Sequence, residues 1–89
     1  MIQLGKKINY LVGRSIEISE FRIGTLIDDI TNRVAKVNIS VPVNKNANGD
    51  VLQWDSFQIT LWNGNEYDLA GQYTDNDIKE RIIKILNNI

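Results

Sequence analysis

The segment RVAKVNISVPV, residues 33–43, alternates apolar and polar side chains more strictly than any other part of the chain. Valine, isoleucine and alanine recur at every second position, with lysine, asparagine and serine between them. A period of two is typical of a β-strand that has one face on the core and the other toward solvent. Pro42 lies near the end of the segment, where an edge strand tolerates a missing N–H. We therefore predict a half-buried strand here.

The segment FRIGTLI, residues 21–27, predicts a second strand that pairs with the first. Its core-facing side chains are expected to be Phe21, Ile23 and Ile27. The following DDITN, residues 28–32, is rich in Asp and Asn, whose side chains bond to nearby backbone and favour turns. Residues 21–43 are therefore predicted to form a β-hairpin.

The apolar pattern changes phase upstream of this hairpin. Ile16 and Ile18 alternate out of step with the apolar residues that follow, which predicts a bulge or a break at Ser19-Glu20. Residues 1–12 also alternate, so they are expected to form either an edge strand or an arm that pairs with a neighbour.

Alternation returns downstream, in SFQITLW at residues 56–62. The inward positions are predicted to be Phe57, Ile59 and Leu61, and the outward positions Gln58, Thr60 and Trp62. The dipeptide Asn63-Gly64 then signals a tight turn. Residues 66–73, which Gly71 interrupts, are expected to be a short strand or an irregular return.

The period changes to that of a helix in TDNDIKERIIKILNNI, at the C-terminal end. The apolar stripe comprises Ile78, Ile82, Ile83, Ile85, Leu86 and Ile89. Thr74, with Asp77 three residues later, is a variant of the capping box, and the acidic first turn suits the helix dipole. An amphipathic helix over residues 75–88, packed on the sheet, is therefore predicted.

Together these elements predict an α+β fold in a single small domain, residues 1–89. Residues 15–73 are expected to be β-rich, and to form a mainly antiparallel sheet of about four to six strands built from β-hairpins, sandwich-like or barrel-like. One C-terminal amphipathic α-helix completes the domain.

The composition argues against an enzyme. The chain has no histidine and no cysteine, which removes the commonest general base, the commonest soft metal ligand and the most reactive nucleophile. Turn and helix-cap chemistry explains the paired carboxylates, Asp28 with Asp29 and Asp75 with Asp77. We expect no catalytic residues, no cofactor and no metal.

One run, NKNANGDVLQWD at residues 44–55, nearly fits the loop of a calcium-binding EF-hand. Asn44, Asn46 and Asn48 fall at positions 1, 3 and 5, and Gly49 at position 6. A functional loop joins two helices, opens with Asp and closes with Glu, whereas strand-like segments flank this run. We therefore predict a polar hairpin loop in which Gly49 takes a positive φ.

The aromatic residues are the main candidates for contact with a partner. Both tryptophans and two of the three tyrosines lie within residues 54–73. Because a small domain also needs large side chains in its core, a core position and an exposed anchor both remain open for Trp62. The candidate contact residues are Trp54, Trp62, Tyr67, Tyr10 and Leu11.

The net charge of −1 is unevenly distributed. Residues 1–45 carry seven Lys and Arg against four Asp and Glu, whereas residues 46–89 carry three against seven. Such asymmetry can orient a protein on a partner or on a copy of itself, as in a homo-oligomer, but is too weak to indicate nucleic acid. A small β-barrel that binds nucleic acid is the alternative hypothesis.

The hydrophobic runs give no sign of a membrane protein. None approaches the about 18 apolar residues that span a bilayer, and the N-terminal segment is too short in apolar residues for a signal peptide. We expect a soluble, unexported protein with no membrane partner.

The order of these features resembles small accessory structural proteins of tailed bacteriophages, of the capsid-decorating or head–tail type. The resemblance covers roughly residues 20–89: the turn DDITNRVAKV, a long hairpin through NANGDVLQW, then NEYDLAGQYTDNDIKERIIKIL. It implies a non-enzymatic protein present in many copies, in the virion or the host cytoplasm. It also implies docking on capsid or neck proteins, or on identical neighbours.

Overall fold

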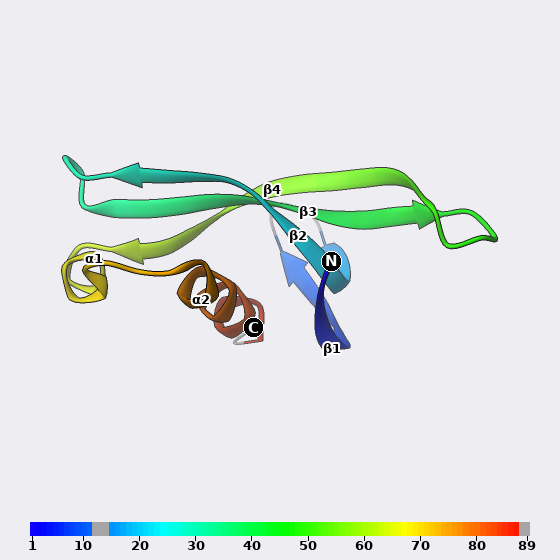
Figure 1. Cartoon of the computed structure of the whole chain (residues 1–89). Coiled ribbons are helices and arrows are strands. Elements are labelled where there is room, and N and C mark those ends of the chain that lie inside the picture. Colours follow the sequence, from blue (N-terminus) through cyan, green and yellow to red (C-terminus); the bar gives the residue numbers. More distant parts are fainter. Residues whose placement is uncertain (12–14, 88–89) are drawn as a thin grey trace.

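Four strands and two helices make up the described part of the chain in the computed structural model, which covers residues 1–11 and 15–87. Their bounds are β1 Ile2–Leu11, β2 Ser15–Asp29, β3 Val34–Lys45, β4 Val51–Asn63, α1 Asn65–Ala70 and α2 Asp75–Asn87. The strands form one antiparallel sheet in the order β1-β2-β3-β4, and both helices follow it in the chain (Figure 1). The predicted α+β class, mainly antiparallel with a C-terminal amphipathic helix, is confirmed. The predicted N-terminal segment, residues 1–12, ends at Val12, and the predicted helix, residues 75–88, ends at Asn88. Both of these end residues lie outside the described residues.

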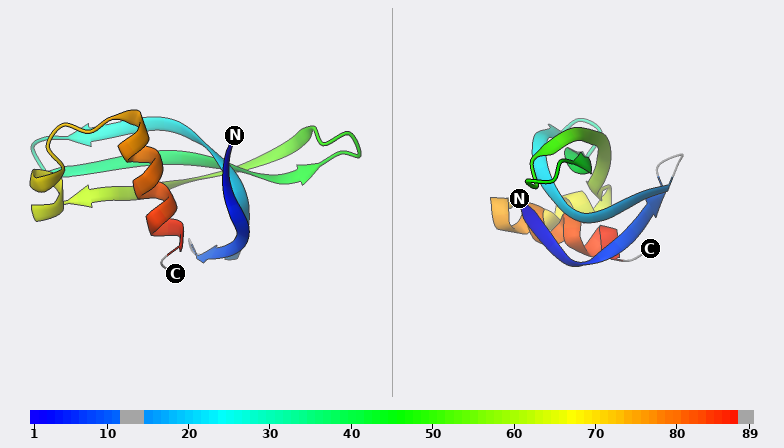
Figure 2. Two further views of the ribbon diagram at one scale, coloured as in Figure 1. Left: turned by 60° about the horizontal axis from the view of Figure 1, so that its bottom comes forward. Right: turned by 90° about the vertical axis from the view of Figure 1, so that its right-hand side faces the viewer.

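Strand β2 is shared between two neighbours along its length. Its first part, from Ser15 to Phe21, pairs with β1, and its second part, from Arg22 to Asp29, pairs with β3. Figure 2 shows β2 curving between these two parts, so that β1 runs across the direction of β3 and β4. The N-terminal segment is thus an edge strand of a strongly bent sheet.

The irregularity predicted near Ser19-Glu20 lies in β1, the strand that pairs with this part of β2. β2 runs through both residues without a break, whereas the pairing register of β1 shifts between Gln3 and Ile8. Gly5 lies in that interval with a φ of 77°, a left-handed conformation that glycine adopts without steric cost. The extra residues of β1 therefore accommodate the phase change in the apolar pattern of β2.

A second bulge, in β2 itself, overturns one predicted orientation. Ile23 is opposite Ile39 and Leu26 is opposite Val37, so β2 has one residue more than β3 in this interval. The bulge keeps Leu26 on the face of Val37 and turns Ile27 to the other face, where Ile27 is 42% exposed. The prediction that Ile27 shares a face with Ile23 is wrong, because one inserted residue reverses the alternation that follows.

The core lies between the sheet and α2. Its buried apolar residues are Ile16, Ile18, Phe21, Ala35, Val37, Ile39, Val41, Ile59, Leu61, Ile78, Ile82 and Leu86. The three that belong to α2 are spaced by four residues and form the centre of the predicted stripe. α2 contacts β4 and β1, the two outer strands of the sheet, and so lies across the concave side of the bend (Figure 2).

Two sets of hydrogen bonds hold the start of α2. The Asp77 N–H donates to Thr74 Oγ1 at 3.2 Å, and the Thr74 N–H donates to Asp77 Oδ2 at 2.9 Å, which confirms the predicted capping box. One turn later, Arg81 Nε donates to the Leu61 carbonyl oxygen at 2.8 Å. The helix is therefore tied by polar contacts to its own N-terminal turn and to β4.

Residues 66–73 do not form the expected strand or irregular return. β4 ends at Asn63, and α1 follows between Gly64, with a φ of 60°, and Gly71, with a φ of 56°. The Asp68 N–H donates to the Gly64 carbonyl oxygen at 3.1 Å. Asn63-Gly64 thus leads into a helix of 6 residues, which is too short to show a helical period in the sequence.

We predict that Ile82→Ala destabilises the fold by about 3–4 kcal/mol, because Ile82 is fully buried at the centre of the α2 stripe. Urea unfolding followed by circular dichroism measures the change. Leu69→Ala, at an α1 position that is 86% exposed, is the control and should change stability by less than about 0.5 kcal/mol. Should the alanine variant fail to fold, Ile82→Val is expected to cost about 1 kcal/mol. Equal effects at positions 82 and 69 would contradict the packing of α2.

Candidate functional site

The most prominent surface feature is a two-stranded arm, residues 42–54, formed by the far ends of β3 and β4 and the loop that joins them. β2 pairs with β3 only as far as Ser40, so beyond this point β3 and β4 pair with each other alone. The arm extends away from both helices and from β1 (Figures 1 and 2). It accounts for the elongated shape of the chain, which measures 45 × 22 × 21 Å.

Two bulges in the arm present apolar side chains to solvent. The register shifts by one residue between Pro42 and Asn44, and again between Asn44 and Lys45. The extra residues are Val43 in β3 and Leu52 in β4, which are 46% and 63% exposed. A bulge redirects its side chain and interrupts the regular strand edge, which discourages pairing with another strand. The arm therefore exposes apolar side chains rather than a regular backbone edge.

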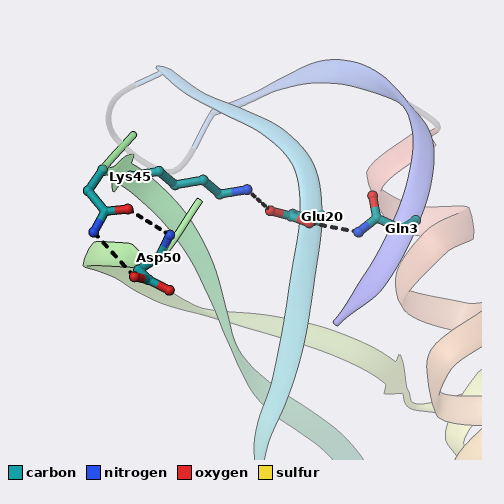
Figure 3. Close-up of polar contacts among 5 residues, drawn as sticks. Gln3, Glu20, Lys45 and Asp50 are labelled. Atoms are coloured by element: carbon teal, nitrogen blue, oxygen red, sulfur yellow. Dashed lines mark hydrogen bonds and ion pairs between the residues drawn. The ribbon is translucent and has the colours of Figure 1, made fainter. Parts of the chain in front are cut away.

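Contacts with β2 brace the arm, at Trp54 near its base and at Lys45 next to its loop. The Arg22 guanidinium lies 3.9 Å from the centre of the Trp54 ring, in a cation–π contact. Lys45 forms an ion pair with Glu20, which also accepts a hydrogen bond of 2.7 Å from Gln3 Nε2 (Figure 3). The hydrogen bond from Lys45, and after it that from Gln3, lowers the pKa of the Glu20 carboxyl. These contacts fix the direction of the arm relative to the rest of the sheet.

The loop at the end of the arm satisfies its own polar groups. Asn46 Oδ1 accepts a hydrogen bond from the backbone N–H of Asn48 at 2.9 Å. It also accepts one from the backbone N–H of Asp50 at 2.9 Å, and Asn46 Nδ2 donates to Asp50 Oδ2 at 3.3 Å (the contacts of Asp50 are drawn in Figure 3). Gly49 has a φ of 84°, so the predicted hairpin loop with a positive φ at this glycine is confirmed. The Asn46 oxygen, which would be a calcium ligand in an EF-hand, holds the backbone turn instead.

At the opposite end of the molecule, a carboxylate and two tyrosines join β2 to α1 and to the segment before α2. Tyr67 Oη donates to Asp28 Oδ1 at 2.5 Å, and Tyr73 Oη donates to Asp28 Oδ2 at 2.9 Å. The hydrogen bond to Asp28 raises the pKa of Tyr67 to about 12. Burial, and after it the hydrogen bond to Asp28, raises the pKa of Tyr73. Asp28 thus anchors the helical end of the fold.

Asp28 and Asp29 do not act as a pair, because they lie at consecutive positions of a strand and make different contacts. Asp29 accepts two hydrogen bonds from Asn32, one from the backbone N–H at 3.1 Å and one from Nδ2 at 2.8 Å. The side-chain bond from Asn32 is the main cause of the lowered pKa of Asp29. The turn predicted at 28–32 therefore begins two residues later, and Asp29 caps it.

Trp62 lies on the core side of β4, contrary to the predicted outward orientation. Ala35 is opposite Trp62 and the next residue of β3 is opposite Thr60, so Leu61 is an extra residue of β4. This bulge turns Trp62 toward the face of buried Ala35, where its ring contacts that of Tyr73 with centroids 4.7 Å apart. Trp62 packs against the core, beside an open groove of about 380 Å³ that α2 also lines. Of the two roles left open for Trp62, the structure shows the packing one.

The candidate contact residues do not gather on one surface. Trp54 lies at the base of the arm, whereas Trp62 and Tyr67 lie at the helical end. Tyr10 stacks on Phe57 with ring centroids 5.2 Å apart, which brings β1 against β4. Their aromatic rings are therefore engaged within the chain.

Leu11 differs from the aromatic candidates, because it is 71% exposed at the end of β1. Sequence reasoning missed Val43 and Leu52, which are exposed and lie together on the arm. Their exposure results from two bulges, and the sequence signal that could have located them is the loss of strict alternation after residue 43.

The basic side chains of the described residues are dispersed, and four of them are paired with carboxylates. The ion pairs of the described residues are Lys7 with Glu17, Arg33 with Asp68, Lys45 with Glu20 and Arg81 with Glu66. They lie on β1, the β2–β3 turn, the arm and α2, so they do not form a continuous basic surface for phosphates.

Within the described ranges, no cluster of three or more potential metal ligands is present, and no helix is long and apolar enough to span a membrane. Comparison of the chain with family models, curated proteins and solved structures gives no match.

We predict that calcium at about 5 mM changes the melting temperature by less than about 1 °C, because the Asn46 oxygen is already used by the turn. Magnesium at the same concentration is the control for ionic strength. A calcium-specific rise of several degrees would show instead that the loop rearranges to bind the ion.

We predict that the fold loses stability as pH rises from about 10 toward 12. The pKa of Tyr67 is about 12 in the folded chain and near 10 when unfolded, so the folded state holds the phenol proton more tightly. That contribution is complete below pH 10 and is lost as Tyr67 ionises through its folded pKa. Absorbance at about 295 nm follows tyrosine ionisation, and urea midpoints follow stability.

Asp28→Asn tests the cause of this alkaline transition, because the uncharged amide removes the acceptor carboxylate. The variant should lower the pKa of Tyr67 toward 10. Asp50→Asn, the same change at the end of the arm, should leave the tyrosine titration as it is. Identical titrations in both variants would exclude Asp28 as the cause.

Proposed function

We propose that this chain is a non-enzymatic structural protein that docks on protein partners, as an accessory component of a tailed-bacteriophage virion. Its partners are capsid or neck proteins, or identical copies of the chain, and it is present in many copies. The braced arm of residues 42–54 is the observation that carries the proposal.

The arm adds little to the stability of the chain itself. The buried core residues all lie outside residues 42–54, and the last of them in β3 is Val41. An isolated two-stranded ribbon is only marginally stable in water. A partner that covers the arm explains why the chain has a braced arm, because full burial of a valine or leucine side chain stabilises a complex by about 1.5–3 kcal/mol.

The contacts between β2 and the arm favour tight docking. Arg22 stacks on Trp54 and Lys45 pairs with Glu20, so the arm keeps one direction before any partner binds. A preordered element loses less conformational entropy on association than a flexible one. Val43 and Leu52 can then enter apolar recesses of a partner while the polar loop remains at the rim.

The charges of the arm support a protein partner over nucleic acid. Its only basic residue, Lys45, is paired with Glu20, and Asp50 lies at its tip. Binding of phosphates requires several accessible basic groups, which also makes affinity strongly dependent on salt. The alternative of a nucleic-acid module therefore receives less support than a protein-docking one.

Virion association tests the proposal. Particles purified by density gradient from cells that carry the gene are expected to contain the chain at a fixed ratio to the major capsid or tail protein. Quantitative mass spectrometry of the particles measures this ratio. A chain that is absent from the particles and remains in the free protein fraction would overturn the proposal.

Arm variants test whether docking uses Val43 and Leu52. The double change Val43→Asp and Leu52→Asp should reduce incorporation into particles by at least about tenfold, because charged groups cannot be buried in apolar recesses. Leu69→Asp, at an exposed apolar position of α1, is the matched control and should be incorporated normally. Thermal unfolding verifies that all variants are folded.

A further inference from the structure

A second surface lies on the strand edge of β2. β1 pairs with β2 only up to Phe21, which is opposite Ile2, and β3 occupies the other side of β2 from Arg22 onward. The side of β2 that faces away from β3 is therefore open from residue 22 to 29, with no strand beside it among the described residues. In Figure 1 this part of β2 lies along the border of the sheet. An open edge presents unpaired backbone N–H and C=O groups to another strand.

The side chains along this edge are uncovered on both faces. Residues 24–28 are all exposed, although they lie in the middle of the chain's longest strand. Leu26 is 38% exposed on the core face, and Ile27 is 42% exposed on the other face. Apolar side chains on an open edge are unusual, because proteins commonly protect such edges with lysine, proline or charge. The edge thus favours occupation by a strand.

The sequence of the edge is complementary to itself when two copies run antiparallel. Directly opposite residues of two antiparallel strands point to the same face of the sheet. A two-fold axis perpendicular to the sheet must therefore lie midway between one residue and the same residue of the second copy. With the axis at Leu26 and the bulge counted as one position, Leu26 meets Leu26 of the second copy. Arg22 of each copy then faces Asp29 of the other, on the outer face.

This register avoids unfavourable pairs. Asp28 is placed opposite Ile23 of the second copy, so its carboxylate stays with the tyrosines of its own chain. The β2 bulge at residues 24 and 25 lies within this edge and is placed opposite Ile27 of the second copy. Opposite charges at the two ends and apolar side chains between them therefore identify a second copy as the occupant.

We propose that the chain forms a homodimer by antiparallel pairing of β2 with β2 of a second copy, centred on Leu26, to give one continuous eight-stranded sheet. The edge of eight residues, 22–29, is short compared with interfaces that bury about 1,200–2,000 Å². The dimer is therefore weak, with a dissociation constant of roughly 10–500 μM. It leaves Val43 and Leu52 of both arms free, and it shares with the proposed docking function only Arg22, which also stacks on Trp54.

Sedimentation velocity over about 10–500 μM protein measures the equilibrium, and should show a concentration-dependent dimer. Leu26→Lys should raise the dissociation constant by roughly tenfold or more, because two lysines would face each other at the axis. Leu69→Lys makes the same change at an exposed position of α1 and should leave the dimer unaffected. A monomer at every concentration, or a dimer that survives Leu26→Lys, overturns the proposal.

Disulfide formation provides a test of register that does not depend on a disruptive variant. The chain has no cysteine, so Leu26→Cys introduces a single thiol. Directly opposite residues in an antiparallel pair have Cα atoms about 4.5–5.5 Å apart, within reach of a disulfide. Leu26→Cys should therefore form covalent dimers under mild oxidation much faster than Leu69→Cys, at an exposed position of α1. Equal rates for the two variants would exclude this register.

The two proposals fail independently. If the chain is a monomer in solution but is incorporated normally into particles, the proposed β2 pairing is wrong and the docking proposal stands. If the chain is a dimer in solution but is absent from particles, the proposed virion role is wrong and the β2 pairing stands.

Discussion

The packing of α2 into the concave side of the bent sheet is the interaction on which the other features depend. β1 and β4 lie at opposite ends of the strand order, and α2 contacts both of them. Ile78, Ile82 and Leu86 supply the helix side of a core whose remaining members come from the strands. In a chain of 89 residues without disulfides, this single core provides most of the stability. Removing the helix would expose the inner faces of β1 and β4.

Polar contacts then determine how the ends of the sheet attach to this core. Asp28 receives hydrogen bonds from Tyr67 and Tyr73, and Arg33 pairs with Asp68, so α1 is held against the β2–β3 turn from two sides. At the other end, Glu20 joins β2 to the arm through Lys45. Exposed ion pairs of this kind contribute little energy individually, but they specify direction. The chain therefore has a packed centre with an oriented extension.

The two surfaces that the fold leaves unused differ in kind. The arm carries bulged, exposed apolar side chains at Val43 and Leu52, and its edges are irregular. The second part of β2 carries exposed side chains at Leu26 and Ile27 on an open edge. The proposed docking therefore uses side-chain packing on the arm, whereas the proposed dimer uses the backbone of β2.

The sequence by itself determined the elements whose signals are local. The alternation in residues 33–43 identified β3, Gly49 located the loop of the arm, and Thr74 with Asp77 located the start of α2. Each of these depends on periodicity, on a backbone conformation or on a cap, and such properties are contained in a few neighbouring residues. The antiparallel α+β class followed from them.

Only the tertiary structure decided which way side chains face beyond a bulge. Ile27 and Trp62 both lie on the face opposite to the one predicted, because one extra residue in β2 and one in β4 reverse the alternation. Whether a strand has an extra residue depends on the strand beside it, and one sequence does not contain that register. The arm, the open edge of β2 and the exposure of Val43, Leu52 and Leu26 follow from the same pairing between strands, so they were beyond the reach of local patterns.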